Sequence, residues 1–258
     1  MNFIRSTGRL SLDFTSTLGR CIIFILNTLL AMCSGKLQLR HFMQQMVSIG
    51  YYSLPVIGLT AAFTGAVLAL QSYTGFSRFN AESAIASVVV LSITRELGPV
   101  LGGLMLAGRV GAAIAAEIAT MRVTEQIDAL YTLNTNPFKY LVVPRVLAGT
   151  IALPCLVLVA DIIGVLGGYL VGVYKLGFSS EVYLRNTLQF LEMDDVLSGL
   201  IKAGAFGFIV TIIGCYCGYY SQKGAKGVGT ATTQAVVTAS ILILLSNYII
   251  TGILFVQR

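Results

Sequence analysis

Long apolar runs constrain this 258-residue chain more than any other feature. Each is long enough for the roughly 20 residues that a helix needs to cross a bilayer. They cover about residues 49–73, 83–108, 146–173, 196–220 and 234–255. Backbone polar groups in lipid must be satisfied internally, which favours helices. The sequence therefore predicts an all-α integral membrane protein with five transmembrane helices. We expect one domain over residues 1–258.

Composition supports this class. Only 11% of the residues are charged and the mean hydropathy is +0.83, whereas soluble domains carry roughly a quarter charged residues. The formal charge of +6 comes from basic residues in short segments between the apolar runs. Such residues set membrane orientation, so we expect no nucleic-acid partner.

The amino-terminal region, residues 1–45, differs from the bundle of residues 46–258. Its apolar run, 21–33, has about 13 residues, fewer than a span needs, and basic residues flank it. This predicts an interfacial helix on the cytoplasmic face, with partial insertion as the alternative. We expect no cleaved signal peptide, because Met32 is too large for a cleavage position.

The distribution of Lys and Arg predicts the orientation. The amino-terminal region, residues 109–145 and residues 221–233 are basic, whereas 74–82 and 174–195 are poorer in basic residues or net acidic. We therefore expect a cytoplasmic amino terminus and a carboxyl terminus on the outer side. The aromatic and acidic residues of 174–195 predict an amphipathic interfacial element.

Arg95 and Glu96 interrupt the second apolar run about 12 residues from its start, roughly 18 Å into the membrane. Charges at that depth need a charged partner or a water-filled cavity. Lys202 of the fourth run is the natural candidate for the partner. One interpretation is a buried ion pair that only holds helices together. The other, which we favour, is an outward-open cavity whose net positive charge suits an anionic lipid headgroup. Asp161 in the third run fits either role.

Small residues recur at every fourth position in two of the runs. Such stripes allow close helix contact in lipid. They comprise Gly103, Ala107, Gly111, Ala115 and Ala119 in one run, and Ala160, Gly164, Gly168 and Gly172 in another.

The segment after the second run carries polar residues at helical spacing. Glu117, Met121, Glu125 and Asp128 share one predicted helix face. Arg122 is placed to pair with Glu125, and Asn136-Pro137 is expected to end the element. We interpret this face as a cytoplasmic docking surface; the alternative is an ordinary solvated loop helix.

Several chemistries have no motif in this sequence. There is no P-loop, no H-E-x-x-H, no G-x-S-x-G and no C-x-x-C. The five cysteines lack zinc-ligand spacing and there is only one histidine, His41. We expect no metal site, no bound cofactor and no catalytic activity; any ATP would be bound by another subunit.

The motif RELGPVLGGLMLAGRVGAAIAAEIATMRVTEQIDALYTLNTNPFKYLVVPR resembles the signature of the MlaE/YrbE permeases, the membrane subunits of MCE-associated ABC lipid transporters. LALQSYTGFSRFNAES, LGGYLVGV, LIKAGAF and GVGTATTQAVV are similar too, so the resemblance covers roughly residues 45–255. It implies a homodimer with a cytoplasmic ATPase dimer that binds ATP and Mg²⁺. It also implies a periplasmic ring of MCE-domain proteins and, in some systems, a small cytoplasmic accessory protein.

The resemblance also assigns roles to residues. The lipid pocket would include Arg95, Glu96 and Lys202, with Phe79 at its mouth. The coupling helix would correspond to TMRVTEQIDAL, with Glu117, Met121, Arg122, Glu125 and Asp128 facing the ATPase.

The expected function is that of a permease subunit in a bacterial inner membrane. It would move phospholipid between that membrane and the periplasmic carrier, which maintains outer-membrane lipid asymmetry. Alternatives are an MCE-type permease for another lipid or hydrophobic substrate, a secondary transporter, or a membrane scaffold. A secondary transporter usually has an internal repeat, and none is evident.

Overall fold

The computed structural model describes residues 2–33, 38–79, 81 and 84–255, and the regular secondary structure of this part of the chain is all helical, without strands. The α-helices are α1 (Asn2–Cys33), α2 (Leu39–Ile49), α3 (Leu54–Phe76), α4 (Ile85–Ser92), α5 (Gly98–Leu106), α6 (Ala112–Val123), α7 (Gln126–Thr132), α8 (Val143–Tyr174), α9 (Ser180–Phe190), α10 (Met193–Tyr219) and α11 (Ala225–Phe255). Short 3₁₀ turns are η1 (Tyr51–Ser53) and η2 (Ser77–Phe79). Three π-helical turns are η4 (Ile93–Leu97), η5 (Ala107–Gly111) and η6 (Phe138–Val142).

Several of these elements join into longer helices. Six helices in the described part are long and apolar enough to cross a membrane: Thr15–Cys33, Leu39–Phe76, Ile85–Val123, Phe138–Tyr174, Met193–Tyr219 and Ala225–Leu254. The prediction of an all-α, multi-pass membrane protein is confirmed. The second apolar run extends further than predicted, because η5 and α6 continue the helix to Val123.

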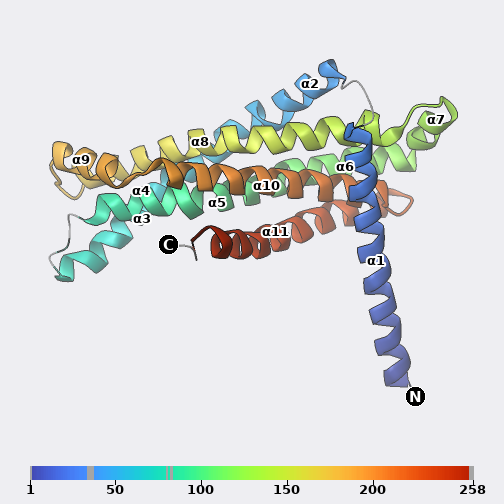
Figure 1. Ribbon diagram of the computed structural model, residues 1–258, viewed down its shortest axis with the longest axis horizontal. Helices are drawn as coiled ribbons and strands as arrows, with labels where there is room; N and C mark the ends of the chain where they lie inside the picture. The colour runs from blue at the N-terminus through green and yellow to red at the C-terminus, as the bar shows by residue number, and fades with distance from the viewer. Residues whose placement is uncertain (1, 34–37, 80, 82–83, 256–258) are drawn as a thin grey trace.

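Helix α1 is much longer than the predicted 13-residue run and has 32 residues. It crosses one end of the bundle instead of running along it (Figure 1). Phe24 anchors it there, with its ring centroid 5.2 Å from that of Phe138 and 5.6 Å from that of Tyr216. This direction agrees with an interfacial helix. Because Thr15–Cys33 is also long enough to span, the count of five crossings stays a prediction.

Helix α10 packs against α8, α11, α5 and α6 and so forms the centre of the bundle. The predicted stripe from Gly103 to Ala119 is buried and faces it. A Cβ at Gly214 would lie 3.0 Å from the carbonyl oxygen of Gly111, and one at Gly218 would lie 2.8 Å from that of Ala115. The stripe is therefore an intramolecular seam at which two helix backbones approach closely.

The stripe on α8 makes a second seam, with α3. A Cβ on Gly65 would overlap the carbonyl group of Gly164, and a Cβ on Gly167 would overlap that of Ala62. Only glycine allows this backbone-to-backbone approach. Because α8 also contacts α10, the two seams hold the long helices in one rigid bundle.

The bundle has two distinct ends (Figure 1). α7 lies at one end, near α1, and α9 lies at the other. The predicted amphipathic element of residues 174–195 is confirmed as α9, whose buried Tyr183 packs on Gly168 and Gly172 of α8. The burial of this side chain raises the pKa of Tyr183 to about 12.

Candidate functional site

The π-helical turn η4 presents Arg95 and Glu96 inside the bundle. A π turn closes i→i+5 hydrogen bonds and widens the helix locally, and such turns are frequent at functional sites. The carbonyl oxygen of Arg95 accepts a hydrogen bond from Nζ of Lys202 on α10 at 2.9 Å. The widened turn therefore presents both side chains and one main-chain oxygen to the neighbouring helices.

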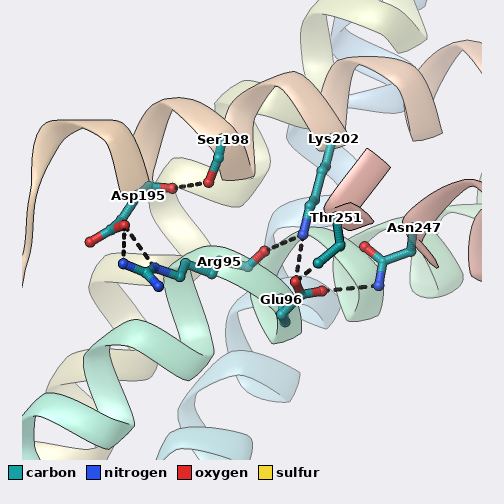
Figure 2. A network of polar contacts seen from close by, with 7 residues as sticks. All are labelled: Arg95, Glu96, Asp195, Ser198, Lys202, Asn247 and Thr251. Atoms are coloured by element: carbon teal, nitrogen blue, oxygen red, sulfur yellow. Dashed lines mark hydrogen bonds and ion pairs between the residues drawn. The ribbon is translucent and has the colours of Figure 1, made fainter. Parts of the chain in front are cut away.

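Glu96 is the acceptor that joins three helices (Figure 2). Its Oε1 lies 2.6 Å from Nζ of Lys202. Asn247 of α11 donates to Oε2 at 2.9 Å, and Thr251 donates to Oε1 at 3.1 Å. The predicted pairing of Glu96 with Lys202 is confirmed, and both carboxylate oxygens accept hydrogen bonds from side-chain donors.

Arg95 turns away from this cluster and pairs with Asp195 of α10. Its Nη2 lies 2.6 Å from Oδ1 of Asp195, and Nε donates to the same oxygen at 2.7 Å. Oδ2 of Asp195 accepts from the backbone N–H of Glu192 at 3.2 Å, as part of the cap that starts α10. The sequence interpretation placed Asp195 in the interfacial segment and so missed it.

The inclusion of Asp195 corrects the predicted charge of the site. Arg95 and Lys202 carry two positive charges, and Glu96 and Asp195 carry two negative charges. The expectation of a net positive cavity is wrong, because it counted only three of these four groups. We call these four residues the four-charge network.

The four-charge network is buried on one side and accessible on the other. The side chains of Lys202 and Asp195 are 0% exposed, whereas those of Glu96 and Arg95 are 37% and 31% exposed. Two adjacent charges of opposite sign therefore remain within reach of a ligand. The buried partners fix their positions.

Besides Asp195, three polar residues of this region were not identified from the sequence: Asn247, Thr251 and Ser198. Asn247 and Thr251 form an i, i+4 polar pair in an otherwise apolar run, a spacing that marks one helix face. Asp195 precedes Lys202 by seven residues, or about two turns, which also places them on one face. Ser198 lies between them and donates to the carbonyl oxygen of Asp195 at 2.8 Å.

Two other candidates from the sequence are not members of the four-charge network. Asp161 is 7% exposed, packs against the backbone of Gly98, and its Oδ1 has no hydrogen-bond partner in the described part of the chain. The backbone of Phe79 ends η2, but its side chain lies outside the described residues. The role predicted for Phe79 at the pocket mouth stays a prediction.

At the opposite end, the predicted coupling face is not one helix. Glu125 adopts φ +59°, a left-handed conformation that interrupts the helix between α6 and α7. Arg122 pairs with Asp128 at 2.7 Å and not with Glu125, so that prediction is wrong. Glu125 instead lies 3.9 Å from Lys223 of the segment between α10 and α11. The sharp turn folds α7 back, which brings Asp128 to Arg122.

The remaining two coupling candidates, Glu117 and Met121, lie earlier in the sequence, within α6. Glu117 pairs with Arg145 of α8 at 2.9 Å, and Met121 is half-buried. The prediction that Asn136-Pro137 ends the element is also wrong. α7 ends at Thr132, and Asn136 Oδ1 accepts from the backbone N–H of Phe138 at 2.9 Å, which caps the next helix.

No group of three or more His, Cys, Asp or Glu side chains in the described part of the chain is arranged to hold a metal ion. The cysteines are all free thiols.

Comparison with known proteins places this geometry in context. A family model described as "Permease MlaE" matches residues 42–253. The chain is 63% identical over 255 residues to a "Probable ABC transporter permease protein" of Rickettsia felis, with 99% of this chain and 98% of the relative covered. It is 38% identical over 262 residues to the "Intermembrane phospholipid transport system permease protein MlaE" of Haemophilus influenzae, with 99% and 98% covered. It is also 36% identical over 226 residues to the chloroplastic protein TRIGALACTOSYLDIACYLGLYCEROL 1 of Arabidopsis thaliana, with 88% and 65% covered.

Proposed function

The chain belongs to the MlaE permease family of ABC transporters, and from this premise we propose that it moves phospholipid between the bacterial inner membrane and periplasmic MCE carrier proteins. As a permease, it is the non-catalytic membrane subunit, and ATP hydrolysis belongs to a separate ATPase subunit. The 38% identical relative that is named for intermembrane phospholipid transport supports this substrate class. The proposed physiological role is maintenance of outer-membrane lipid asymmetry.

The observation that carries the proposal is that Arg95 and Glu96, in the four-charge network, are partly exposed to a ligand. Arg95 and Glu96 each have a fully buried partner of opposite charge. Fixed charges inside a membrane protein are costly and are typical of substrate pathways. Arg95 would contact the headgroup phosphate, and apolar helix surfaces would contact the acyl chains. Because the network is neutral, we expect it to accept zwitterionic headgroups as well as anionic ones.

The proposed assembly is a homodimer of this chain with two cytoplasmic ATPase subunits, each holding ATP and Mg²⁺. A ring of periplasmic MCE-domain proteins would cover the other side, and a small cytoplasmic accessory protein would complete it. We propose a cytoplasmic amino terminus and a periplasmic carboxyl terminus. This places the four-charge network in the outer half of the membrane and the α7 end against the ATPase.

The α6–α7 turn is the proposed coupling element. Its exposed charges, Glu125 and Asp128, are supported by Lys223 and Arg122. ATP binding in the partner would displace this turn and, through the rigid α6–α10 seam, change the space around the four-charge network.

Liposome transfer of a fluorescent phospholipid by the purified complex tests the proposal. We expect Glu96→Ala and Lys202→Ala to reduce transfer strongly while the ATPase still co-purifies. Lys175→Ala, which removes an exposed cation after α8, is the matched control and should transfer normally. Unchanged transfer in the two variants would contradict the site. If transfer and assembly are lost together, the four residues are only a structural ion-pair network.

A further inference from the structure

A polar cavity lies outside the four-charge network, between α2 and the helix that runs from η5 into α6. Its free volume is about 140 Å³. Apolar and polar side chains share its walls: Gln45, Ser48, Ile49, Arg109, Val110, Ala113, Ile114 and Glu117. Arg109 follows Glu96 by 13 residues on one continuous helix, so the two sites are separated by about 20 Å.

Arg109 is the cation of this cavity, and it is only partly engaged. Its Nη1 donates to Oγ of Ser53 at 2.6 Å and to the carbonyl oxygen of Ser48 at 3.3 Å. These bonds orient the guanidinium from one side. Across residues 2–33, 38–79, 81 and 84–255, its other N–H groups have no hydrogen-bond partner. A planar guanidinium held in this way retains donors in the geometry that suits a phosphate.

The single carboxylate in the lining does not neutralise Arg109. Glu117 is bound at 2.9 Å by Arg145, whose side chain is 7% exposed. With Arg145 included, the three charges sum to plus one. The cavity therefore has a positive charge that the described residues do not balance.

The surroundings of the cavity have the character of a membrane interface. Tyr51 and Tyr52, next to Ser53, are 67% and 59% exposed, and tyrosine is enriched at the headgroup level. Arg109 lies 24 residues from Ile85, or about 36 Å along the helix, more than the ~30 Å of a hydrocarbon core. The exposed Met43 and Val47 on α2 supply apolar surface beside the cavity.

We propose that this cavity binds the phosphate group of a membrane phospholipid from the leaflet on the α7 side. Arg109 donates to the phosphate oxygens, and Gln45 and Ser48 add hydrogen bonds. The apolar walls at Ile49, Val110 and Ile114 contact the glycerol region, which a free phosphate ion would leave unused. The bound lipid joins α2 to α6 at the point where α2 meets α3 through η1.

Native mass spectrometry of the full-length chain, purified with its co-purifying subunits, tests the assignment. The probe is a short-chain phosphatidylglycerol, titrated after detergent delipidation. Arg109→Gln should bind one fewer lipid per chain with high affinity, or the same lipid at least about tenfold more weakly, because charge-assisted hydrogen bonds are lost. Arg109→Lys should recover part of the affinity.

Two more variants separate binding from folding. Gln45→Glu adds a negative charge to the cavity and leaves the bonds of Arg109 to Ser48 and Ser53 in place, so it should weaken lipid binding in a protein with the melting temperature of the wild type. Arg40→Gln removes an exposed cation from the same helix and should bind as the wild type does.

Three outcomes would overturn the proposal. One is lipid binding in Arg109→Gln and Gln45→Glu equal to that of the wild type. Another is equal loss in Arg40→Gln, which would indicate a diffuse surface effect. The third is binding of inorganic phosphate at this cavity with no binding of the lipid probe.

Discussion

Nζ of Lys202 lies 2.6 Å from Oε1 of Glu96, and the lysine side chain is completely buried while the glutamate is 37% exposed. The two partners of this ion pair therefore differ in what they lose when the other is removed. Glu96 retains donors from Asn247 and Thr251. Lys202 also donates to the carbonyl oxygen of Arg95 at 2.9 Å.

This asymmetry predicts unequal effects of mutation. We expect Glu96→Ala to destabilise the protein by about 3 kcal/mol, since it removes the carboxylate that lies 2.6 Å from a buried ammonium. Lys202→Met should cost less. The double variant should recover part of the loss of Glu96→Ala. Thermal unfolding of the four proteins in detergent measures this cycle, and strictly additive effects would contradict the coupling.

Replacement of Asp195 by asparagine should change the lipid preference of the site. Asp195→Asn removes one of two negative charges but keeps an oxygen that can accept from Glu192 N–H. The four-charge network becomes net positive. We expect anionic phospholipid to be transferred faster relative to zwitterionic phospholipid, as measured in paired liposomes of the two compositions. An unchanged ratio would mean that the network does not contact the headgroup.

The glycine seams predict a sharp dependence on side-chain size. A Cβ on Gly207 would overlap the carbonyl oxygen of Gly149, whereas a Cβ on Gly229 meets no atom within 4 Å. Gly207→Ala should therefore destabilise the protein by about 1–3 kcal/mol through overpacking. Gly229→Ala should be neutral or slightly stabilising, because alanine favours the helix. Melting temperatures in one detergent compare the pair directly.

Charge reversal at the α6–α7 turn should release the ATPase. Glu125→Lys combined with Asp128→Lys is expected to abolish co-purification of the ATPase subunit. The companion is the double variant Arg122→Asp and Asp128→Arg, which swaps the two charges and so preserves the local ion pair. It should keep the wild-type melting temperature and still lose the partner. Full ATPase retention in both would place the docking surface elsewhere.

Alkaline pH should destabilise the docking of α9 through Tyr183. Burial raises the pKa of this phenol from its ordinary value near 10 to about 12 in the folded protein. The neutral phenol is therefore the form that the folded state favours. Its contribution to stability is fully present below pH 10 and is lost as pH rises toward 12.

Tyr183→Phe removes this titration. The variant should show a smaller fall in melting temperature between pH 10 and 12 than the wild type does. Tyr174→Phe, at an 81% exposed position, is the control and should follow the wild type. An equal fall in all three proteins would exclude Tyr183 as the group responsible.

Local periodicity predicted much of the fold. The apolar runs predicted the long helices, and the four-residue stripe from Gly103 to Ala119 predicted a face of close helix contact, although not that α10 would cover it. The pairing of Glu96 with Lys202 followed from the cost of unpaired charge in a membrane. The long helices and the small-residue stripe depend only on the spacing of residues within one helix. The ion pair depends on the need of a buried charge for an opposite charge, which Lys202 can meet.

The errors arose where tertiary contacts or a single backbone angle decide the outcome. Asp195 lies at the start of α10, and only the packing of α10 on η4 brings it to Arg95. The left-handed conformation of Glu125 breaks a pattern that would otherwise continue as a helix, since a non-glycine residue rarely adopts it. That turn redirects Arg122 to Asp128. No spacing rule predicts either event.

The π turn η5, at Ala107–Gly111, has a consequence for how this helix tolerates insertions and deletions. On an ideal α-helix a strict four-residue repeat drifts by about 40° per step, so a stripe from residue 103 to residue 119 would wind away from a straight neighbour. The wider turn takes up part of this drift and keeps both halves of the stripe in phase with α10. A π turn holds one residue more than an α turn, so loss of one residue within η5 would restore regular α geometry with little rotation of the helix beyond it. Loss of one residue from the regular helix on either side would instead rotate everything beyond it by about 100°, so this helix should tolerate a deletion within η5 far better than one in α5 or α6.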